Sequence, residues 1–272
     1  MPNKDFKNNI KSDSYIGVFD SGMGGISTLI ELKKVMPNEN FYYFGDSGNA
    51  PYGPKTPEQI LELSLAVSDL LYQKNIKAIV VACNTATSIA IKKLRNRFPD
   101  IPVIGVEPAV KLGVDSGGKN ILVMATQTTI REEKFLNLVN KFDNDCVINS
   151  IACPELVQIA ENDLLYNSDL CEKQLREYFS QFDMDKIDTI VLGCTHFIFY
   201  KKYIRNILGY NQIIVDGNLG TANHLYNELK NRKLLSSQLS DGKIEFMNSQ
   251  IITDDMTVDK LELSKKLYND FI

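Results

Sequence analysis

Short apolar runs recur along the chain and are separated by polar, glycine-rich or proline-rich segments. Most of these runs are continuous rather than alternating in polarity, which is typical of strands buried on both faces of a sheet. We expect strands at residues 15–20, 40–46, 78–84, 102–106, 120–126, 146–151, 188–194 and 212–216.

Segments with apolar residues at helical spacing lie between these runs. In the segment 56–75, Thr56 is suited to cap a helix and Pro57 to occupy its first position. Strands that alternate with helices predict parallel sheets flanked by helices. We therefore expect an α/β fold.

Two segments look like corresponding parts of two similar halves. "IVVACNTATS" (79–88) and "TIVLGCTHFI" (189–198) are each an apolar strand that ends at a cysteine and continues through threonine into a helix-like segment. Self-similarity of this kind is typical of a duplicated unit. The pattern favours two related α/β domains.

Length and composition describe an ordinary globular protein. The chain has 272 residues, of which 44% are hydrophobic and 24% charged, enough for one large or two modest domains. The apolar run at 78–82 is far shorter than the roughly 20 residues of a membrane span, and the N-terminus lacks a signal-peptide pattern. We expect a cytoplasmic protein with no membrane partner.

Charge and cysteine content argue against several classes of protein. A net charge of −4 without a basic stripe argues against a nucleic-acid partner. Five cysteines at irregular spacing suggest free thiols rather than a disulfide framework. Because there is no C-x₂-C pair and the histidines are His196 and His224, we expect no metal site.

The glycine-rich segment "GVFDSGMGGIST" (17–28) follows the first expected strand. Such a turn lets a ligand approach the backbone and directs free helix N–H groups at an anion. It lacks the lysine of a P-loop, and Ser27 stands where a dinucleotide-binding loop has its third glycine. A tight turn without a ligand is the alternative, but Asp20 and Ser21 at the carboxyl end of a strand favour a binding site.

The segment "GDSGNAPYGPKT" (45–56) also follows an expected strand. Its prolines stiffen the loop and its glycines free the backbone. We consider two interpretations: a rigid surface loop, or a contact from Tyr52 and Gly53 to a substrate carboxylate.

The cysteines divide into two groups by position. Cys146 and Cys171 are expected to be inert buried residues, and Cys153 is ambiguous. Cys83 and Cys194 each end a strand and precede an expected helix N-terminus, where the macrodipole favours a thiolate. Each is followed by side chains that can bond to a substrate, Asn84 and Thr85 in one case and Thr195 and His196 in the other.

Several reactions use activated cysteines. A thioredoxin-like redox centre requires two cysteines close in sequence. A Cys-His hydrolase can use either thiol with His196, but it leaves the second thiol unexplained. The remaining option is a two-base enzyme, in which one thiolate removes a proton from one face of a carbon and an opposite thiol delivers one to the other face.

Two thiols suit the racemisation of a free amino acid without a cofactor. A cysteine, with a pKa of about 8.5 in model peptides, can act as acid or base near neutral pH. Carboxylates nearby would disfavour a second negative charge, and an imidazole can share the proton. Asp20, Glu161 and His196 are candidates for these supporting roles.

The motifs resemble those of one known family. "GVFDSGMGG", "GDSGNAPYG", "ACNTAT", "GVEPA" (105–109), "CPELVQIAE" (153–161) and "GCTH" (193–196) occur in the order and approximate spacing found in glutamate racemases. The resemblance extends from about residue 15 to 216. Two departures, Ser47 to Asn49 after Asp46 and Ile198 in place of a proline, affect loops rather than the thiols.

The resemblance implies a cofactor-independent enzyme that interconverts L- and D-glutamate and supplies D-glutamate for peptidoglycan. It implies two similar α/β domains, 14–107 plus 215–272 and 108–214, with the substrate in the cleft between them, and a homodimer. An aspartate racemase of the same superfamily and a non-catalytic ligand-binding protein on this fold are the alternatives.

The motif match also implies site residues. Cys83 and Cys194 would be the acid/base thiols, supported by Asp20, Glu161 and His196. The substrate-binding residues would be Asp20, Ser21, Tyr52, Gly53, Asn84, Thr85, Thr126, Thr195 and His196. Because the motifs contain no arginine, we expect backbone N–H groups and hydroxyls to bind the substrate carboxylates; Thr126 is equally suited to cap a helix.

Overall fold

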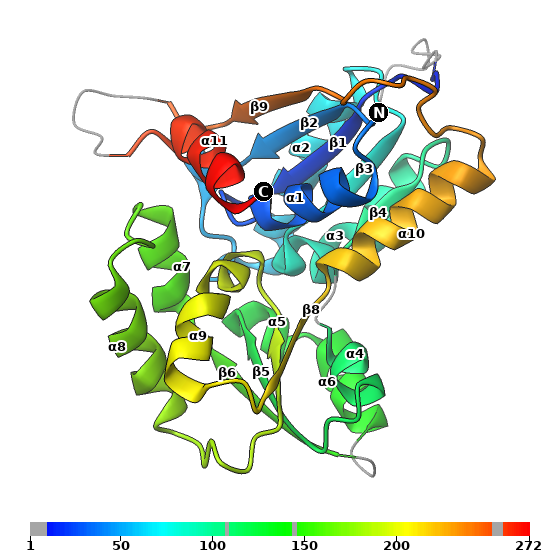
Figure 1. The fold of residues 1–272 in the computed structure, drawn as a ribbon. Coiled ribbons are helices and arrows are strands. Elements are labelled where there is room, and N and C mark those ends of the chain that lie inside the picture. Colours follow the sequence, from blue (N-terminus) through cyan, green and yellow to red (C-terminus); the bar gives the residue numbers. More distant parts are fainter. Residues whose placement is uncertain (1–9, 107–108, 143–145, 252–257) are drawn as a thin grey trace.

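The computed structural model describes residues 10–106, 109–142, 146–251 and 258–272. Two α/β units lie against each other, and each has a parallel sheet flanked by helices (Figure 1). The predicted fold class is confirmed. The expected boundary at residues 107 and 108, with the centre of the "GVEPA" motif, lies outside the described residues.

The first unit contains a five-stranded sheet within the described ranges, in the order β4-β3-β1-β2-β9. Every neighbouring pair in it is parallel. Its strands are β1 (Ile16–Asp20), β2 (Phe41–Gly45), β3 (Ala78–Val81), β4 (Val103–Gly105) and β9 (Ile244–Asn248). The last of these joins the sheet from the C-terminal part of the chain, beside β2.

The second unit contains a four-stranded parallel sheet within the same ranges, in the order β6-β5-β7-β8. Its strands are β5 (Asn120–Ala125), β6 (Val147–Ala152), β7 (Thr189–Leu192) and β8 (Ile213–Asp216). Because β8 pairs with β7 over its whole length, we propose that the chain returns to the first unit after Asp216, two residues later than expected from the motifs.

Helices cover both faces of each sheet. Those of the first unit are α1 (Ile26–Val35), the short 3₁₀ helix η1 (Ser47–Asn49), α2 (Pro57–Tyr72), α3 (Asn84–Arg97), α10 (Asn218–Asn231) and α11 (Lys260–Phe271). Those of the second are α4 (Val110–Asp115), α5 (Gln127–Arg131), α6 (Glu133–Lys141), α7 (Pro154–Glu161), α8 (Ser168–Phe179), the 3₁₀ helix η2 (Thr195–Tyr200) and α9 (Lys201–Leu208). None of the helices in the described ranges is both long and apolar enough to span a membrane.

The sequence signals of α2 act as expected. Thr56 is the N-cap residue, its side chain accepts the backbone N–H of Gln59, and the Gln59 side chain accepts the N–H of Thr56. This reciprocal capping box and Pro57 at the first position begin the helix. The helix then buries Ile60, Val67 and other residues of one face against the first sheet.

The strands are buried on alternate faces by different helices. Val18 and Val80 belong to a core shared with α1, α10 and α11, whereas Phe19 and Val81 pack on the side of α2 and α3. The core on the α1 side continues into the second unit, where it includes residues of α7 and η2. The two units are therefore joined by a common apolar core, and the carboxyl ends of their central strands meet beside it.

Candidate active site

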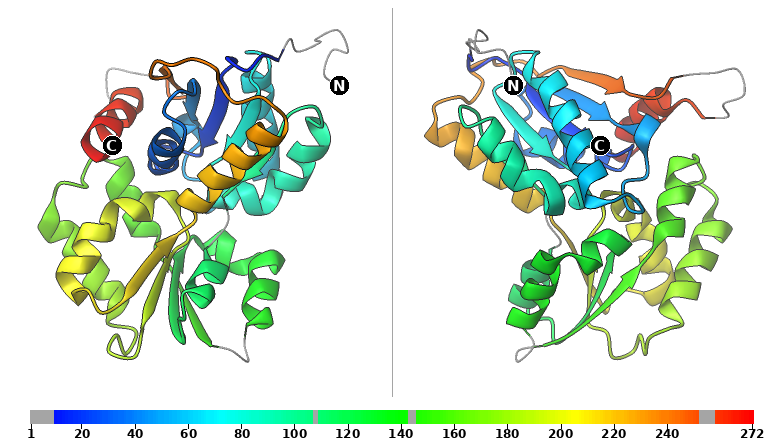
Figure 2. Two further views of the ribbon diagram at one scale, coloured as in Figure 1. Left: turned by 45° about the vertical axis from the view of Figure 1, so that its right-hand side comes forward. Right: turned by 180° about the vertical axis from the view of Figure 1, so that it is seen from behind.

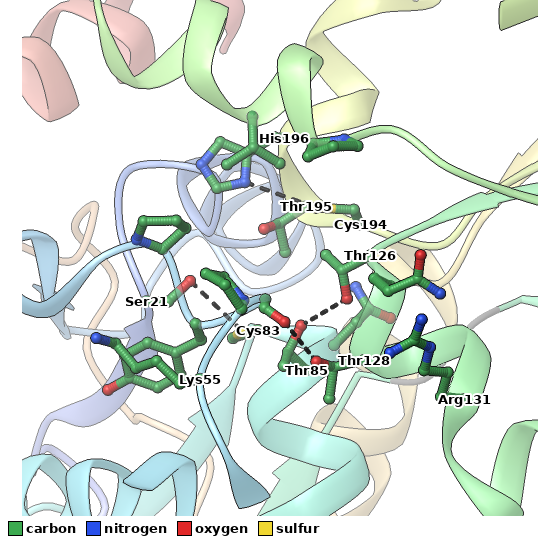
Figure 3. Close-up of a pocket in the computed structure, with 18 of the residues that line it drawn as sticks. Ser21, Lys55, Cys83, Thr85, Thr126, Thr128, Arg131, Cys194, Thr195 and His196 are labelled. Atoms are coloured by element: carbon green, nitrogen blue, oxygen red, sulfur yellow. Dashed lines mark hydrogen bonds between the residues drawn. The ribbon is translucent and has the colours of Figure 1, made fainter.

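A cavity of about 540 Å³ opens between the two units at these strand ends (Figure 3). Side chains from both units line it. The predicted residues in the wall are Ser21, Tyr52, Gly53, Cys83, Asn84, Thr85, Thr126, Cys194, Thr195 and His196. Residues that are far apart in the sequence thus share one site.

Cys83 follows β3 and is the N-cap residue of α3. Its sulfur accepts the backbone N–H of Ala86 at 3.4 Å and lies 3.5 Å from the hydroxyl of Ser21. Burial and the nearby Asp20 carboxylate raise the pKa of the Cys83 thiol to about 12, despite these hydrogen bonds. Burial therefore opposes the thiolate that the helix N-terminus was expected to favour at Cys83.

Cys194 follows β7, but the helix expected after it is a 3₁₀ helix, η2, without a side-chain cap. Its sulfur lies 3.6 Å from His196 Nδ1, and His196 Nε2 donates to Glu161 Oε1 at 2.8 Å. Burial opposes a charge on this imidazole, but the contacts with Cys194 and Glu161 prevail and raise the pKa of His196 well above its usual value. These contacts thus favour the protonated form of the imidazole beside the second thiol.

Asp20 and Glu161 lie behind the cavity wall rather than in it. Asp20 accepts the backbone N–H of Gly22 at 3.0 Å and the hydroxyl of Thr195 at 3.1 Å. Burial raises the pKa of Asp20 above its ordinary value, against the opposing charge of His196. Direct binding of the substrate by Asp20 stays a prediction, and the observed position suits a residue that acts through its neighbours.

The glycine-rich turn makes room for side chains of the other unit. A Cβ atom at Gly22 would lie 2.0 Å from Glu161 Oε1, and one at Gly24 would lie 2.5 Å from His196 Nδ1. The backbone N–H of Met23 donates to Glu161 Oε1 at 2.9 Å. The close approach that the glycines allow is therefore made by Glu161 and His196, whereas the sequence suggested a ligand in that place.

The loop after β2 forms another part of the wall. The hydroxyl of Tyr52 donates to Asp46 at 2.6 Å, and the carbonyl of Gly53 accepts the hydroxyl of Thr128. Tyr52 therefore presents its ring to the cavity while its hydroxyl bonds to Asp46 behind the wall.

Thr126 caps a helix and also lines the cavity. Its hydroxyl accepts the backbone N–H of Thr129 at 3.3 Å as the N-cap of α5, and it lies 3.0 Å from the hydroxyl of Thr85. The Thr85 to Thr126 bond joins the two units across the cavity (Figure 3).

Asn84 offers an unused acceptor to the cavity. Its residue is 5% exposed, and its Oδ1 atom has no hydrogen-bond partner among the described residues. A buried acceptor without a partner is costly unless a ligand supplies the donor. This oxygen is suited to a substrate ammonium group.

Two cations in the wall were missed by the sequence reasoning. Lys55 and Arg131 both line the cavity (Figure 3). Lys55 lies within the quoted motif "GDSGNAPYGPKT", and Arg131 follows the Thr126 cap by little more than one helical turn. The spacing from that cap was the available signal for Arg131. Positive charge is therefore present in the cavity wall.

The other cysteines lie outside the wall. Cys146, Cys153 and Cys171 are buried cysteines that do not line the cavity. Burial raises the pKa of the Cys171 thiol to about 11, and its sulfur contacts the carbonyls of Leu164 and Leu165. The geometry thus separates Cys83 and Cys194 from the remaining thiols.

Comparisons with known proteins identify the family of this chain. The family model described as Asp/Glu/Hydantoin racemase matches residues 26–224. A glutamate racemase of Bifidobacterium longum is 44% identical over 269 residues, which cover 96% of this chain and all of that protein. The chain therefore belongs to the Asp/Glu/hydantoin racemase family and, within it, to the glutamate racemase family.

Solved structures show the same fold. A Thermus thermophilus glutamate racemase in complex with β-chloro-D-alanine superposes with a TM-score of 0.79 at 29% identity, over 94% of each chain. A Francisella tularensis glutamate racemase in complex with D-glutamate gives a TM-score of 0.79 at 28% identity, over 95% of this chain and 94% of that one.

Proposed function

We propose that this protein interconverts L- and D-glutamate by a two-thiol mechanism that uses no cofactor. The observation that carries the proposal is the position of Cys83 and Cys194, which come from the strand ends of two different sheets and line one cavity. Each sulfur has its own polar partners, Ser21 for Cys83 and His196 for Cys194. A Cys-His hydrolase would leave Cys83 without a role.

In this mechanism the two cysteines account for both the proton that leaves Cα and the proton that Cα receives. One thiolate takes the proton from Cα, and the electron pair of the C–H bond stays on the substrate as a carbanion. The opposite thiol then donates its proton to the other face of Cα. The enzyme finishes with the two protonation states exchanged, which prepares it for the reverse reaction.

The cavity wall has groups for each charge of glutamate. The free Oδ1 of Asn84 is placed to accept from the substrate ammonium group. Hydroxyls of Ser21 and Thr85 can donate to a carboxylate, and Lys55 and Arg131 add positive charge to the same wall. This combination favours an acidic amino acid over a neutral one.

The proposal extends to the role of the product and to the assembly. As the family resemblance implies, D-glutamate would be used for peptidoglycan, the reaction would take place in the cytoplasm, and the protein would be a homodimer. Depletion of the gene product in its host should then stop growth unless D-glutamate is added, and light scattering of the purified protein should give the mass of two chains.

The reaction is tested with purified protein that is free of pyridoxal phosphate. L- and D-glutamate and L- and D-aspartate are each incubated in D₂O, and optical rotation and α-deuterium incorporation are followed. We expect rapid loss of rotation with both glutamate enantiomers and little change with aspartate. Deuterium exchange at Cα of aspartate alone would show that aspartate, and not glutamate, is the substrate. Absence of exchange with both amino acids would contradict the racemase proposal.

A further inference from the structure

The C-terminal helix α11 brings a lysine to the residue that supports His196. Lys260, the first residue of α11, has its Nζ atom 3.2 Å from Glu161 Oε2 and also donates to the backbone carbonyl of Glu161. The Lys260 side chain is 13% exposed and that of Glu161 is 11% exposed. Both views in Figure 2 place α11 next to the α7 end of the second unit. This ion pair is therefore largely removed from water.

The two oxygens of Glu161 have separate tasks. Oε1 accepts from the backbone of Met23 and from His196 Nε2. Oε2 is buried and has no hydrogen-bond partner among the described residues, so the ammonium group of Lys260 is the charge that faces it. Lys260 thus faces one oxygen of the carboxylate, and His196 bonds to the other.

We propose that Lys260 is a positioning residue for the reaction: it keeps Glu161 ionised and oriented, so that Glu161 holds the imidazole of His196 against the Cys194 sulfur. This inference rests on the two-thiol function proposed above. Lys260 does not line the cavity and has no contact with the substrate site.

The charges around Glu161 give Lys260 a measurable effect. His196 and Lys260 face the carboxylate with positive charge, whereas Asp20 and the Tyr43 hydroxyl lie on the side of the first sheet. Burial would raise the pKa of Glu161, but the contacts with His196 and Lys260 hold it below its usual value. Loss of the lysine charge should therefore raise the pKa of Glu161. Glu161 would then be protonated, and would cease to accept the hydrogen bond of His196, at a higher pH than in the wild type.

A second lysine of α11 provides a matched control. Lys266 pairs with Asp163 just beyond the end of α7, with Nζ 2.9 Å from Oδ1, and this pair is exposed. It links α11 to the segment directly after α7, whereas Lys260 pairs with Glu161 at the end of α7. Replacement of Lys266 therefore tests the docking of α11, and replacement of Lys260 tests the charge beside Glu161.

The experiment compares Lys260→Met, Lys260→Arg and Lys266→Met in the full chain. For Lys260→Met we expect kcat for glutamate to fall about tenfold and the acid limb of kcat/KM to move up by about one pH unit. Lys260→Arg should return the acid limb of kcat/KM to its wild-type pH, and Lys266→Met should have the same kcat and acid limb as the wild type. In a Glu161→Gln background, Lys260→Met should have no further effect. An unchanged acid limb in Lys260→Met, or a full additional loss in the Glu161→Gln background, would overturn the inference.

A spectroscopic readout separates this inference from the proposed function. Because the chain has two histidines, the imidazole N–H signals can be assigned with a His196→Asn variant. The His196 Nε2 proton, hydrogen-bonded to Glu161, should change its shift as the pH falls, with a midpoint about one unit higher in Lys260→Met than in Lys266→Met. Equal midpoints would refute the role of Lys260 even if the wild type proved inactive. If the methionine variant does not fold, Lys260→Gln is compared in the same way.

Discussion

The hydroxyl of Thr195 donates to the carboxylate of Asp20 at 3.1 Å. This hydrogen bond links the neighbour of Cys194 to the carboxylate that affects Cys83. Asp20 belongs to the first unit and its charge contributes to the raised pKa of Cys83. Thr195 belongs to the second unit and directly follows Cys194. The electrostatics of the two thiols are therefore connected across the interface between the units.

Asp20→Asn should lower the pKa of Cys83. The wild-type pKa is about 12, with burial as the main cause and the Asp20 charge as the second. Removal of a negative charge favours the thiolate, so alkylation of Cys83 by iodoacetamide at pH 8 should become about tenfold faster. The rate is measured by mass spectrometry of the Cys83 peptide. Thr195→Val, which keeps the charge of Asp20, is the control, and a slower reaction in Asp20→Asn would contradict the account.

Gly24→Ala in the first unit should displace site residues of the second unit. The added Cβ would lie 2.5 Å from both His196 Nδ1 and Thr195 Oγ1, so these side chains must move. We expect kcat/KM to fall by about 10²-fold and the protein to lose roughly 1–3 kcal/mol of unfolding free energy. At Gly220 in α10, an added Cβ would meet no heavy atom of the described residues within 4 Å outside the backbone of its own helix. Gly220→Ala should therefore keep full activity and gain about 0.5–1 kcal/mol of unfolding free energy. Similar activities in the two variants would refute the steric role of Gly24.

Lys55 and Arg131 should contribute to substrate capture. We expect Lys55→Met and Arg131→Met each to raise KM for glutamate by roughly 3- to 10-fold with little change in kcat, and the difference to shrink as salt screens the charges. Initial rates at several ionic strengths measure this. Lys111→Met removes the same charge from an exposed pair with Asp115, outside the cavity wall, and should leave KM unchanged. An equal rise in KM for this control would show a general charge effect instead.

The strands and their parallel arrangement could be predicted because continuous apolar runs end at turn-forming residues. Strand β9 was missed because charged and polar residues interrupt the apolar residues of "KIEFMNSQ" (243–250). The residues of the strand are half-buried or exposed at the sheet edge. A strand of this kind is recognised from its pairing with β2, which is a long-range contact.

The meeting of Cys83 and Cys194 at one cavity could be predicted, because the carboxyl ends of strands in parallel sheets converge. The electrostatics of these cysteines could not. The raised pKa of Cys83 depends on burial and on Asp20, and neither follows from a local helix N-terminus. Lys260 contacts Glu161 across 99 positions of sequence, and no motif or periodicity in α11 distinguishes it from the other lysines of that helix.

The central claim is that both Cys83 and Cys194 transfer protons at Cα. Single variants Cys83→Ser, Cys194→Ser and Cys171→Ser are compared by the rate of glutamate racemisation, with circular dichroism confirming the fold. The account predicts a loss of about 10³-fold in each of the first two and a rate within about twofold of the wild type for Cys171→Ser, because Cys171 lies outside the cavity. A wild-type rate in either Cys83→Ser or Cys194→Ser would contradict it.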